Sequence, residues 1–373
     1  MLQNKPDTLT YPTPDCEWTT SITPVDNAII EPPTEVRKIQ PGGVYRSGGE
    51  YMHLGSMWRD RVQTLRPSEV IPTPTMELSG TWLWGGVWYE HFGHFLMETL
   101  SRIWAVHSVH EPIQGIIWIK KSPRLSDTPI RYQTDLLEAF GFSGEIFFAK
   151  SITRVARLLV PGPGLGIGKI SRGTTVFHNM TSSHFGKNIQ ADGASRIYVS
   201  RVGLGVISSG VLGEVFIEKQ LIKDGYAVVR PETLSISQQI AAYKAADQAI
   251  IMDGSAAHLC AMTPSAKRHL ALILRRRHFN GPIIEHINGF SAHPPLIIDT
   301  LKHLFNMPGE RGMRENYWAV LDFSSLGEKL YQAGLISTPD LFIGGEADAL
   351  AELAHVSSHA PIAAISPEKL RPY

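Results

Sequence analysis

The chain has 373 residues, with 35 Lys and Arg against 35 Asp and Glu, so its formal net charge at neutral pH is zero. This balance excludes a global positive field that would attract nucleic acid or an anionic membrane, and any anionic ligand must be held by local groups. The length suits two ordinary domains or one large one, and two cysteines are too few for a disulfide framework.

No stretch of about 18 uninterrupted apolar residues appears in the chain, and Met1–Asp7 has no apolar run behind its one lysine. These features predict a soluble, cytoplasmic protein without a transmembrane segment. Peripheral association through a helix lying on a membrane surface stays open. The sequence indicates no oligomeric state.

Residues 1–80 are rich in proline, and Glu31-Pro-Pro-Thr and Ile71-Pro-Thr-Pro-Thr interrupt any long element. Short strands and ordered loops are expected there. The next stretch, Trp82–Trp104, places a Gly85-Gly86 hinge before a proline-free segment with the apolar period of a helix, from Glu90 to Trp104.

At about 100° per residue, that helix would gather four polar side chains on one face: His91, His94, Glu98 and Arg102. Its opposite side would carry apolar residues toward the core. The stretch also holds four of the eight tryptophans of the chain. We expect these large flat side chains to line a cleft beside the polar face.

Two histidines and a carboxylate on one face suit three kinds of site: general bases, metal ligands, or a hydrated helix surface. A hydrated face usually pairs Lys with Glu, and this face has no Lys. The histidines are three residues apart, whereas the paired zinc ligands of helical metalloproteases are four apart. The pattern favours general bases, and no metal is expected.

Helix and strand patterns alternate through the rest of the first half, which is typical of an α/β layer. A helix is predicted over Arg131–Phe140 with a stop at Gly141, and strands over Gly115–Lys120, Glu145–Lys150 and Arg154–Val160. The glycine-rich residues 161–169 lack the spacing of a phosphate loop or a dinucleotide fingerprint. They are expected to form a connecting loop.

From residue 190 the alternation becomes clearer. Helices are expected over Val211–Asp224, from a Ser235–Gln238 capping box to Ala246, and after Gly254. Strands are expected over Arg196–Arg201, Tyr226–Arg230, Ala249–Asp253 and His269–Leu274. Such a run builds a parallel sheet that binds ligands at the carboxyl ends of its strands. Farther on, Glu315–Asp322 reads as a strand or short helix, and Leu326–Ala333 as an amphipathic helix.

Two of these strand ends carry groups that suit a diphosphate. Arg201 offers forked donors at the end of one strand. Asp253-Gly254-Ser255 follows another strand and leads into a helix, whose first N–H groups attract anions. Each feature also has a plainer interpretation, as a surface ion pair for Arg201 and as a tight turn for Gly254.

In this order the motifs resemble glycosyltransferase family 61, and within it the bacterial members of capsule and other polysaccharide biosynthesis. The residues that carry the resemblance are Gly85-Gly86, His94–Arg102, Tyr198–Arg201, Pro231–Ser235, Gln238–Ile240 and Gly254–His258. The sequence departs from the family pattern with Glu98 in place of Asp, Ser101 in place of Pro, Gln238 in place of Glu, and Gly213-Glu214 in place of Asn-Glu.

The resemblance implies an α/β fold of the GT-B type, with two Rossmann-like domains that face each other across a cleft. Residues 1–190 are then expected to form the N-terminal, acceptor-side α/β domain. Residues 191–300 would form the C-terminal Rossmann-like domain that binds the nucleotide sugar. Residues 301–373 would be an extension that could pack back on the N-terminal domain.

The implied activity is that of an inverting, metal-independent hexosyl- or pentosyltransferase without a cofactor. It would move a sugar from a nucleoside-diphosphate sugar to a glycan or other saccharide acceptor in polysaccharide biosynthesis. Glu98 or His94 would be the catalytic base. The residues expected to bind substrate are His91, Arg102, Ser200, Arg201, Glu232, Ser235, Asp253, Gly254, Ser255 and His258.

Two other classes of function stay open. One is a noncatalytic protein of polysaccharide assembly that binds sugar or nucleotide. The other is a dinucleotide-dependent oxidoreductase, and the absence of Gly-x-Gly-x-x-Gly after a strand argues against it.

Overall fold

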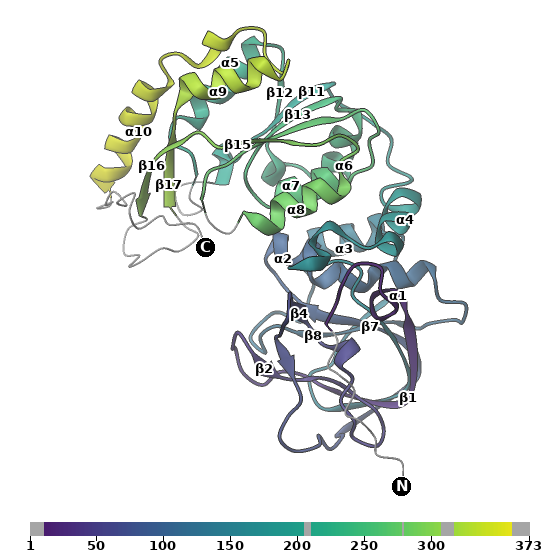
Figure 1. The fold of residues 1–373 in the computed structure, drawn as a ribbon. Coiled ribbons are helices and arrows are strands. Elements are labelled where there is room, and N and C mark those ends of the chain that lie inside the picture. The colour runs from purple at the N-terminus through teal and green to yellow at the C-terminus, as the bar shows by residue number, and fades with distance from the viewer. Residues whose placement is uncertain (1–10, 205–209, 278–279, 307–316, 360–373) are drawn as a thin grey trace. The chain divides into compact units, whose positions relative to one another are not determined.

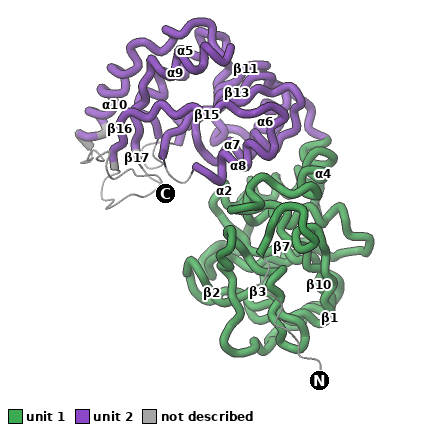
Figure 2. The backbone as a smooth tube through the Cα atoms, viewed as in Figure 1, with its two compact units in different colours: residues 1–187 green, residues 188–373 purple. Residues whose placement is uncertain are grey.

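A computed structural model describes residues 11–204, 210–277, 280–306 and 317–359 of the chain. The chain divides into two compact units, Met1–Lys187 and Asn188–Tyr373 (Figures 1 and 2). Parallel strands and helices occur in both units, so the expected α/β class is confirmed. Within the described ranges, no helix has both the length and the apolar character needed to cross a membrane.

The first unit is built on a mixed six-stranded sheet in the order β3-β1-β10-β7-β8-β9. Strands β10, β7, β8 and β9 run parallel to one another, while β1 is antiparallel to both β10 and β3. The strand bounds are β1 Ile22–Glu31, β3 Gly43–Tyr45, β7 Met76–Trp88, β8 Gly115–Lys120, β9 Glu145–Phe148 and β10 Thr153–Pro161. The three strands predicted between residues 115 and 160 are therefore present, and β8 has the predicted bounds and is buried.

Short strands are present between residues 40 and 66, as expected, whereas strand β1 has ten residues and pairs with β10 along almost its whole length. The hinge expected at residues 85 and 86 is wrong. The pair Gly85-Gly86 is not a hinge but lies inside the thirteen-residue strand β7. The strand register shifts between Trp84 and Gly86, and a Cβ atom on Gly85 would overlap the Trp118 indole of β8.

The tryptophans of this stretch form core rather than a cleft wall. Trp82, Trp84, Trp88 and Trp104 are each at most 2 % exposed. Trp88 packs edge-to-face against Trp118, with ring centroids 5.0 Å apart. Burying these large rings stabilises the sheet and its helical cover, so they are unavailable to a ligand.

The predicted helix from Glu90 to Trp104 is present only as two shorter pieces. The α-helix α2 covers Phe92–Met97, and a 3-10 helix, η2, covers Thr99–His107. Glu98 lies at the junction, where the Thr99 hydroxyl accepts from Tyr89 N and donates to Val87 O, each at 3.0 Å. A 3-10 helix has three residues per turn instead of 3.6, so the polar face predicted for one regular helix does not continue past Glu98.

The first unit also contains further helices and short strands. Helix α3 ends just before Gly141, which has φ +80°, as predicted. The loop after β10 packs on the Trp104 indole, which donates to Gly162 O at 3.0 Å. The other elements are α1 Glu17–Thr20, α3 Arg131–Ala139, α4 Thr175–His184, η1 His53–Gly55, η3 Lys169–Arg172, β2 Gln40–Pro41, β4 Trp58–Arg59, β5 Val62–Gln63 and β6 Leu65–Arg66.

The second unit contains the predicted parallel sheet, in the order β12-β11-β13-β14-β15. Its strands are β11 Arg196–Val199, β12 Ala227–Val229, β13 Gln248–Met252, β14 His269–Ile273 and β15 Leu296–Ile298. The intervening helices are α5 Glu214–Lys223, α6 Ile236–Ala245, α7 Ala256–Met262 and α8 Gly281–Phe290, with short turns η4 Val202–Leu204 and η6 Pro231–Thr233. The predicted capping box at Ser235 and Gln238 is confirmed.

The described residues after 300 belong to this second unit. They form β16 Leu301–Asn306, β17 Tyr317–Leu321, α9 Phe323–Gln332, η7 Pro339–Phe342 and α10 Gly345–His359. Leu304, Ala319 and Leu330 share one buried cluster with Tyr198 and Ile250 of the parallel sheet. Glu315–Asp322, predicted as a strand or short helix, contains strand β17 from Tyr317 to Leu321, and Glu315 and Asn316 lie outside the described residues. The functional division into three domains stays a prediction.

Candidate active site

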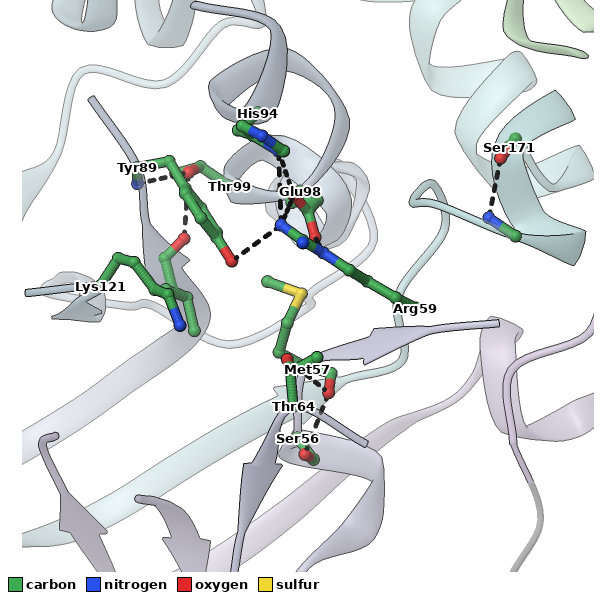
Figure 3. Close-up of polar contacts among 12 residues, drawn as sticks. Ser56, Met57, Arg59, Thr64, Tyr89, His94, Glu98, Thr99, Lys121 and Ser171 are labelled. Atoms are coloured by element: carbon green, nitrogen blue, oxygen red, sulfur yellow. Dashed lines mark hydrogen bonds and ion pairs between the residues drawn. The ribbon is translucent and has the colours of Figure 1, made fainter. Parts of the chain in front are cut away.

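His94, Glu98, Arg59 and Tyr89 meet at the junction of α2 and η2 (Figure 3). The Glu98 carboxylate accepts a forked pair of hydrogen bonds from Arg59, with Nε to Oε1 at 2.8 Å and Nη2 to Oε2 at 2.9 Å. Oε2 also accepts from His94 Nδ1 at 2.5 Å. The Tyr89 ring stacks on the His94 imidazole with centroids 5.2 Å apart. One turn of helix thus brings the two candidate bases into direct contact.

Glu98 is held as a carboxylate anion. Its side chain has no exposed surface, and burial by itself would raise its pKa, but the hydrogen bonds from His94 and Arg59 outweigh burial and lower the pKa. On Arg59, burial opposes the charge, and Glu98 nevertheless raises the pKa of the guanidinium. The pair is therefore ionised, and both oxygens of Glu98 are engaged by Arg59 and His94.

The same contacts fix the tautomer of His94. An ionised carboxylate can only accept, so the 2.5 Å contact places the proton on Nδ1. In the neutral ring Nε2 is then an acceptor, and 38 % of this side chain is exposed. A histidine oriented by a buried carboxylate is an arrangement that can take a proton from a hydroxyl group.

Of the two other residues predicted for this face, His91 lies near His94 and Arg102 does not. His91 precedes α2 and its ring lies 5.3 Å from the His94 ring. Arg102 is buried and donates to Leu54 O at 2.8 Å and Ser56 O at 2.7 Å. Burial lowers the pKa of Arg102 to about 9. It ties η2 to the η1 turn instead of joining the His94 face.

In the second unit, the carboxyl ends of β11, β13 and β14 bring Arg201, Asp253 and Arg276 together. Arg276 binds the Asp253 carboxylate through Nε at 2.9 Å and Nη2 at 3.0 Å. Burial lowers the pKa of Arg201, although Glu214 and Asp253 act in the opposite direction. Burial would raise the pKa of Asp253, but Arg276 outweighs it and the pKa is lowered. This edge therefore holds ionised groups of both signs.

Ser200 and Arg201 are fixed by the buried Glu214. The carboxylate accepts from Arg201 N at 2.7 Å, Tyr198 OH at 3.0 Å and Ser200 Oγ at 3.3 Å. Burial raises the pKa of Glu214 to about 7 in spite of these donors. Glu214 thus organises the end of β11. Its residue type is the one that the family pattern has, and only the preceding Gly213 differs from that pattern.

Gly254 has a packing role beside Arg201. A Cβ atom there would overlap Arg201 Nη1, so a larger residue would push this guanidinium out of its place. Ser255 precedes α7, which has seven residues, and its side chain makes no capping hydrogen bond. His258 is buried in α7, with Nδ1 2.7 Å from Nδ1 of His286 on α8.

Glu232 and Ser235 lie just before α6. Glu232 is exposed on η6, and a Cβ atom on Gly203 would overlap its carboxylate, so these two segments lie in contact. The Ser235 hydroxyl accepts from Gln238 N at 3.2 Å and lies 2.9 Å from Ser237 Oγ. Its first role is to cap the helix.

Sequence reasoning missed two groups of site residues. Arg59 reaches Glu98 from a two-residue strand outside any recognisable motif, so no signal pointed to it. Arg275-Arg276-Arg277 directly follow the predicted strand ending at Leu274, and three adjacent arginines at a strand end were a usable signal. Among the described residues, no three His, Cys, Asp or Glu side chains are grouped so as to hold a metal ion.

Comparison with known families supplies one match. The family model described as Glycosyltransferase 61 matches residues 92–270, slightly less than half of the chain. This match confirms the resemblance drawn from the motifs. No curated protein matches the chain. Arg59, Tyr89 and Arg275–Arg277 lie outside the matched segment.

Proposed function

We propose that this chain, whose residues 92–270 belong to glycosyltransferase family 61, moves a sugar from a nucleoside-diphosphate sugar to a saccharide hydroxyl with inversion at the anomeric carbon. The family implies a glycosyltransferase, with a donor and an acceptor as its substrates. The observation that carries the proposed chemistry is the 2.5 Å contact between His94 Nδ1 and Glu98 Oε2.

In the proposed reaction, His94 is the base and Glu98 orients it. The acceptor O–H proton passes to His94 Nε2 while the acceptor oxygen forms a bond to the anomeric carbon. The bond between that carbon and the donor phosphate oxygen breaks, and its electron pair leaves with the nucleoside diphosphate. A general base of this kind typically contributes ~10²–10⁴ in rate.

The donor side of the proposal rests on the second unit. Arg201 and Arg276 would neutralise the charge that develops on the leaving diphosphate, which supports a reaction without a metal. Parallel sheets commonly bind ligands at the carboxyl ends of their strands, and Glu232, Ser235, Ser255 and His258 follow strands of this sheet. The GT-B arrangement, a cytoplasmic location and a place in polysaccharide biosynthesis remain predictions from the resemblance.

A thermal-shift panel tests the donor site. UDP- and GDP-linked sugars, with CMP-linked sugars as a monophosphate comparison, are added to the purified protein and to Arg201→Ala, each with and without EDTA. A ligand at 100 times its Kd stabilises the fold by ~2.7 kcal/mol, so the donor should raise the Tm of the wild type. We expect one nucleotide class to do so, to resist EDTA, and to lose its effect in the variant.

The reaction itself is tested by incubating that donor with candidate saccharide acceptors and following nucleoside diphosphate release. Release that depends on acceptor supports transfer. A donor that binds without any release, with or without acceptor, contradicts the proposed enzyme and leaves a binding protein. If no donor of any class shifts the Tm, the assigned phosphate site is wrong.

A further inference from the structure

The His94 cluster consists of Arg59, Tyr89, His94 and Glu98. His94 and Glu98 lie in the segment matched by the family model, and Tyr89 lies just before it, whereas Arg59 comes from a distant part of the first unit. It is the last residue of β4, directly before the turn of the β4–β5 hairpin, in which Asp60 has φ +52°. Backbone contacts fix this hairpin, because Asp60 N donates to Ile167 O at 2.9 Å. The Trp58 indole also donates to His53 O at 3.0 Å. Arg59 therefore approaches Glu98 from a rigid segment.

We infer that Arg59 is a positioning residue for the transfer reaction: its forked contact keeps Glu98 an anion that accepts from His94 Nδ1, so that His94 Nε2 is the base. This inference rests on the proposed function. It goes beyond that function by assigning a role to a residue that lies outside the family match, 39 positions before Glu98.

The contact geometry supports a role through Glu98. Arg59 uses Nε and Nη2 on the two carboxylate oxygens, and a forked guanidinium fixes the plane of a carboxylate in a way that a single ammonium group cannot. That plane decides where Oε2 lies relative to His94. Arg59 Nη2 is also 3.5 Å from His94 Nδ1 and 3.4 Å from the Tyr89 hydroxyl.

The charge of Arg59 has a second effect on His94. The guanidinium lies beside the imidazole, with Nη2 3.5 Å from Nδ1, so a variant without this charge changes the electrostatic surroundings of the ring. The other titratable groups around His94 are His91, which precedes the same helix, and Tyr89 at the end of β7. Lys121, after β8, also interacts electrostatically with Arg59 and Glu98.

The test compares Arg59→Met and Arg59→Lys with the wild type across pH, using the donor and acceptor identified above. Arg59→Met removes the charge and the fork, so kcat should fall by about 10–100-fold, as for other partners that orient a reactive group. KM should stay near the wild-type value. The acidic limb of the kcat profile should move to higher pH, because removing the guanidinium charge favours a proton on the His94–Glu98 pair.

Arg59→Lys keeps the charge but loses the fork. Its kcat should fall while its acidic limb stays close to that of the wild type. Arg154→Met is the matched control, since Arg154 also pairs with a carboxylate of the first unit, Glu77, at 3.1 Å. That pair is on the surface and away from the His94 cluster. Its removal should therefore change neither kcat nor the acidic limb of the kcat–pH profile.

Titration of the His94 ring by NMR, assigned with His94→Gln, gives a readout that needs no turnover. If the wild-type enzyme shows no transfer, the proposed function fails, whatever the titration shows. If the wild type is active but Arg59→Met leaves both the acidic limb and the ring titration unmoved, the role of Arg59 is wrong. A rise in KM with unchanged kcat would instead make Arg59 a substrate-binding residue and would also overturn the inference.

Discussion

The Glu98 side chain has no exposed surface, whereas 38 % of the His94 side chain is exposed. This difference separates the two bases that the sequence left as alternatives. A buried carboxylate with both oxygens bonded cannot reach a substrate hydroxyl without breaking those contacts. Under the proposed mechanism the neighbouring histidine uses its second nitrogen, Nε2, so substitutions at the two positions should fail in different ways.

For His94→Gln, kcat should fall by ~10²–10⁴, the contribution of a general base, with a Tm close to that of the wild type. Steady-state kinetics and a thermal melt measure the two quantities. His110→Gln, at an exposed position of the same unit, serves as the control and should be neutral. Near-normal turnover of His94→Gln would exclude His94 as the base.

Glu98→Gln should lose stability as well as activity. The amide cannot balance the charge of Arg59, and breaking a buried ion pair costs up to about 3 kcal/mol here. Urea unfolding, monitored by tryptophan fluorescence, measures the loss. An unchanged unfolding midpoint together with lost activity would instead favour Glu98 itself as the base.

Glu214 should make the stability of the protein depend on pH. Its folded-state pKa of about 7 lies above the ordinary value of 4.5, so its contribution to stability is complete below about pH 4.5 and is lost as pH rises through about 7. Each unit of pKa corresponds to about 1.4 kcal/mol. Glu214→Gln removes this titration, so the variant should gain stability relative to the wild type between pH 5 and pH 8.

Urea unfolding at several pH values checks this difference. Glu328→Gln, at an exposed position of α9, is the control, and its free energy of unfolding should differ from that of the wild type by the same amount at every pH. A difference that is equally constant for Glu214→Gln would show that Glu214 has the same pKa in the folded and unfolded states.

At the scale of elements, local pattern predicted most strands and helices after residue 110. Strand β8 and the capping box of α6 follow from apolar runs and from Ser and Gln at fixed spacing. The segment before residue 107 was predicted less well. Periodicity alone does not distinguish a regular α-helix from one that continues as a 3-10 helix. At this junction the Thr99 hydroxyl binds the backbone of Val87 and Tyr89, at the end of β7, and this contact has no local pattern.

Gly85 and Gly86 in β7 are predicted from sequence to be a hinge, whereas in the structure Gly85 allows close packing. Gly85→Ala should therefore destabilise the protein by about 1–3 kcal/mol, the usual cost of overpacking, because its Cβ atom would overlap the Trp118 indole. Gly48→Ala is the control, since a Cβ atom there meets no atom within 4 Å. Thermal or urea unfolding compares the two, and equal stability would refute the packing role.

At the scale of the whole molecule, the sequence predicted the α/β class and the resemblance to glycosyltransferase family 61, but not the placement of the last 73 residues. Their described part completes the core of the second unit. Long-range packing of this kind has no local pattern, because Leu304 and Leu330 look like any apolar residues until the fold brings them to Tyr198 and Ile250.

Leu330→Ala should destabilise the chain by about 2–5 kcal/mol, as expected for truncating a fully buried leucine. Leu350→Ala, on α10 with 52 % of its residue surface exposed, should change stability by less than about 0.5 kcal/mol. Unfolding curves of both full-length variants measure the difference. Similar small effects would mean that the chain after residue 300 contributes little to the fold.

The core shared by residues on both sides of position 300 has a practical consequence for chimeras. The segment recognised by the family model stops at residue 270, inside β14, and begins after β7. An exchange of that segment between relatives would split both sheets and would leave Arg59 and Arg276 behind. Recombination at Lys187 and Asn188, between the two compact units, would instead transfer each sheet together with its own charged residues.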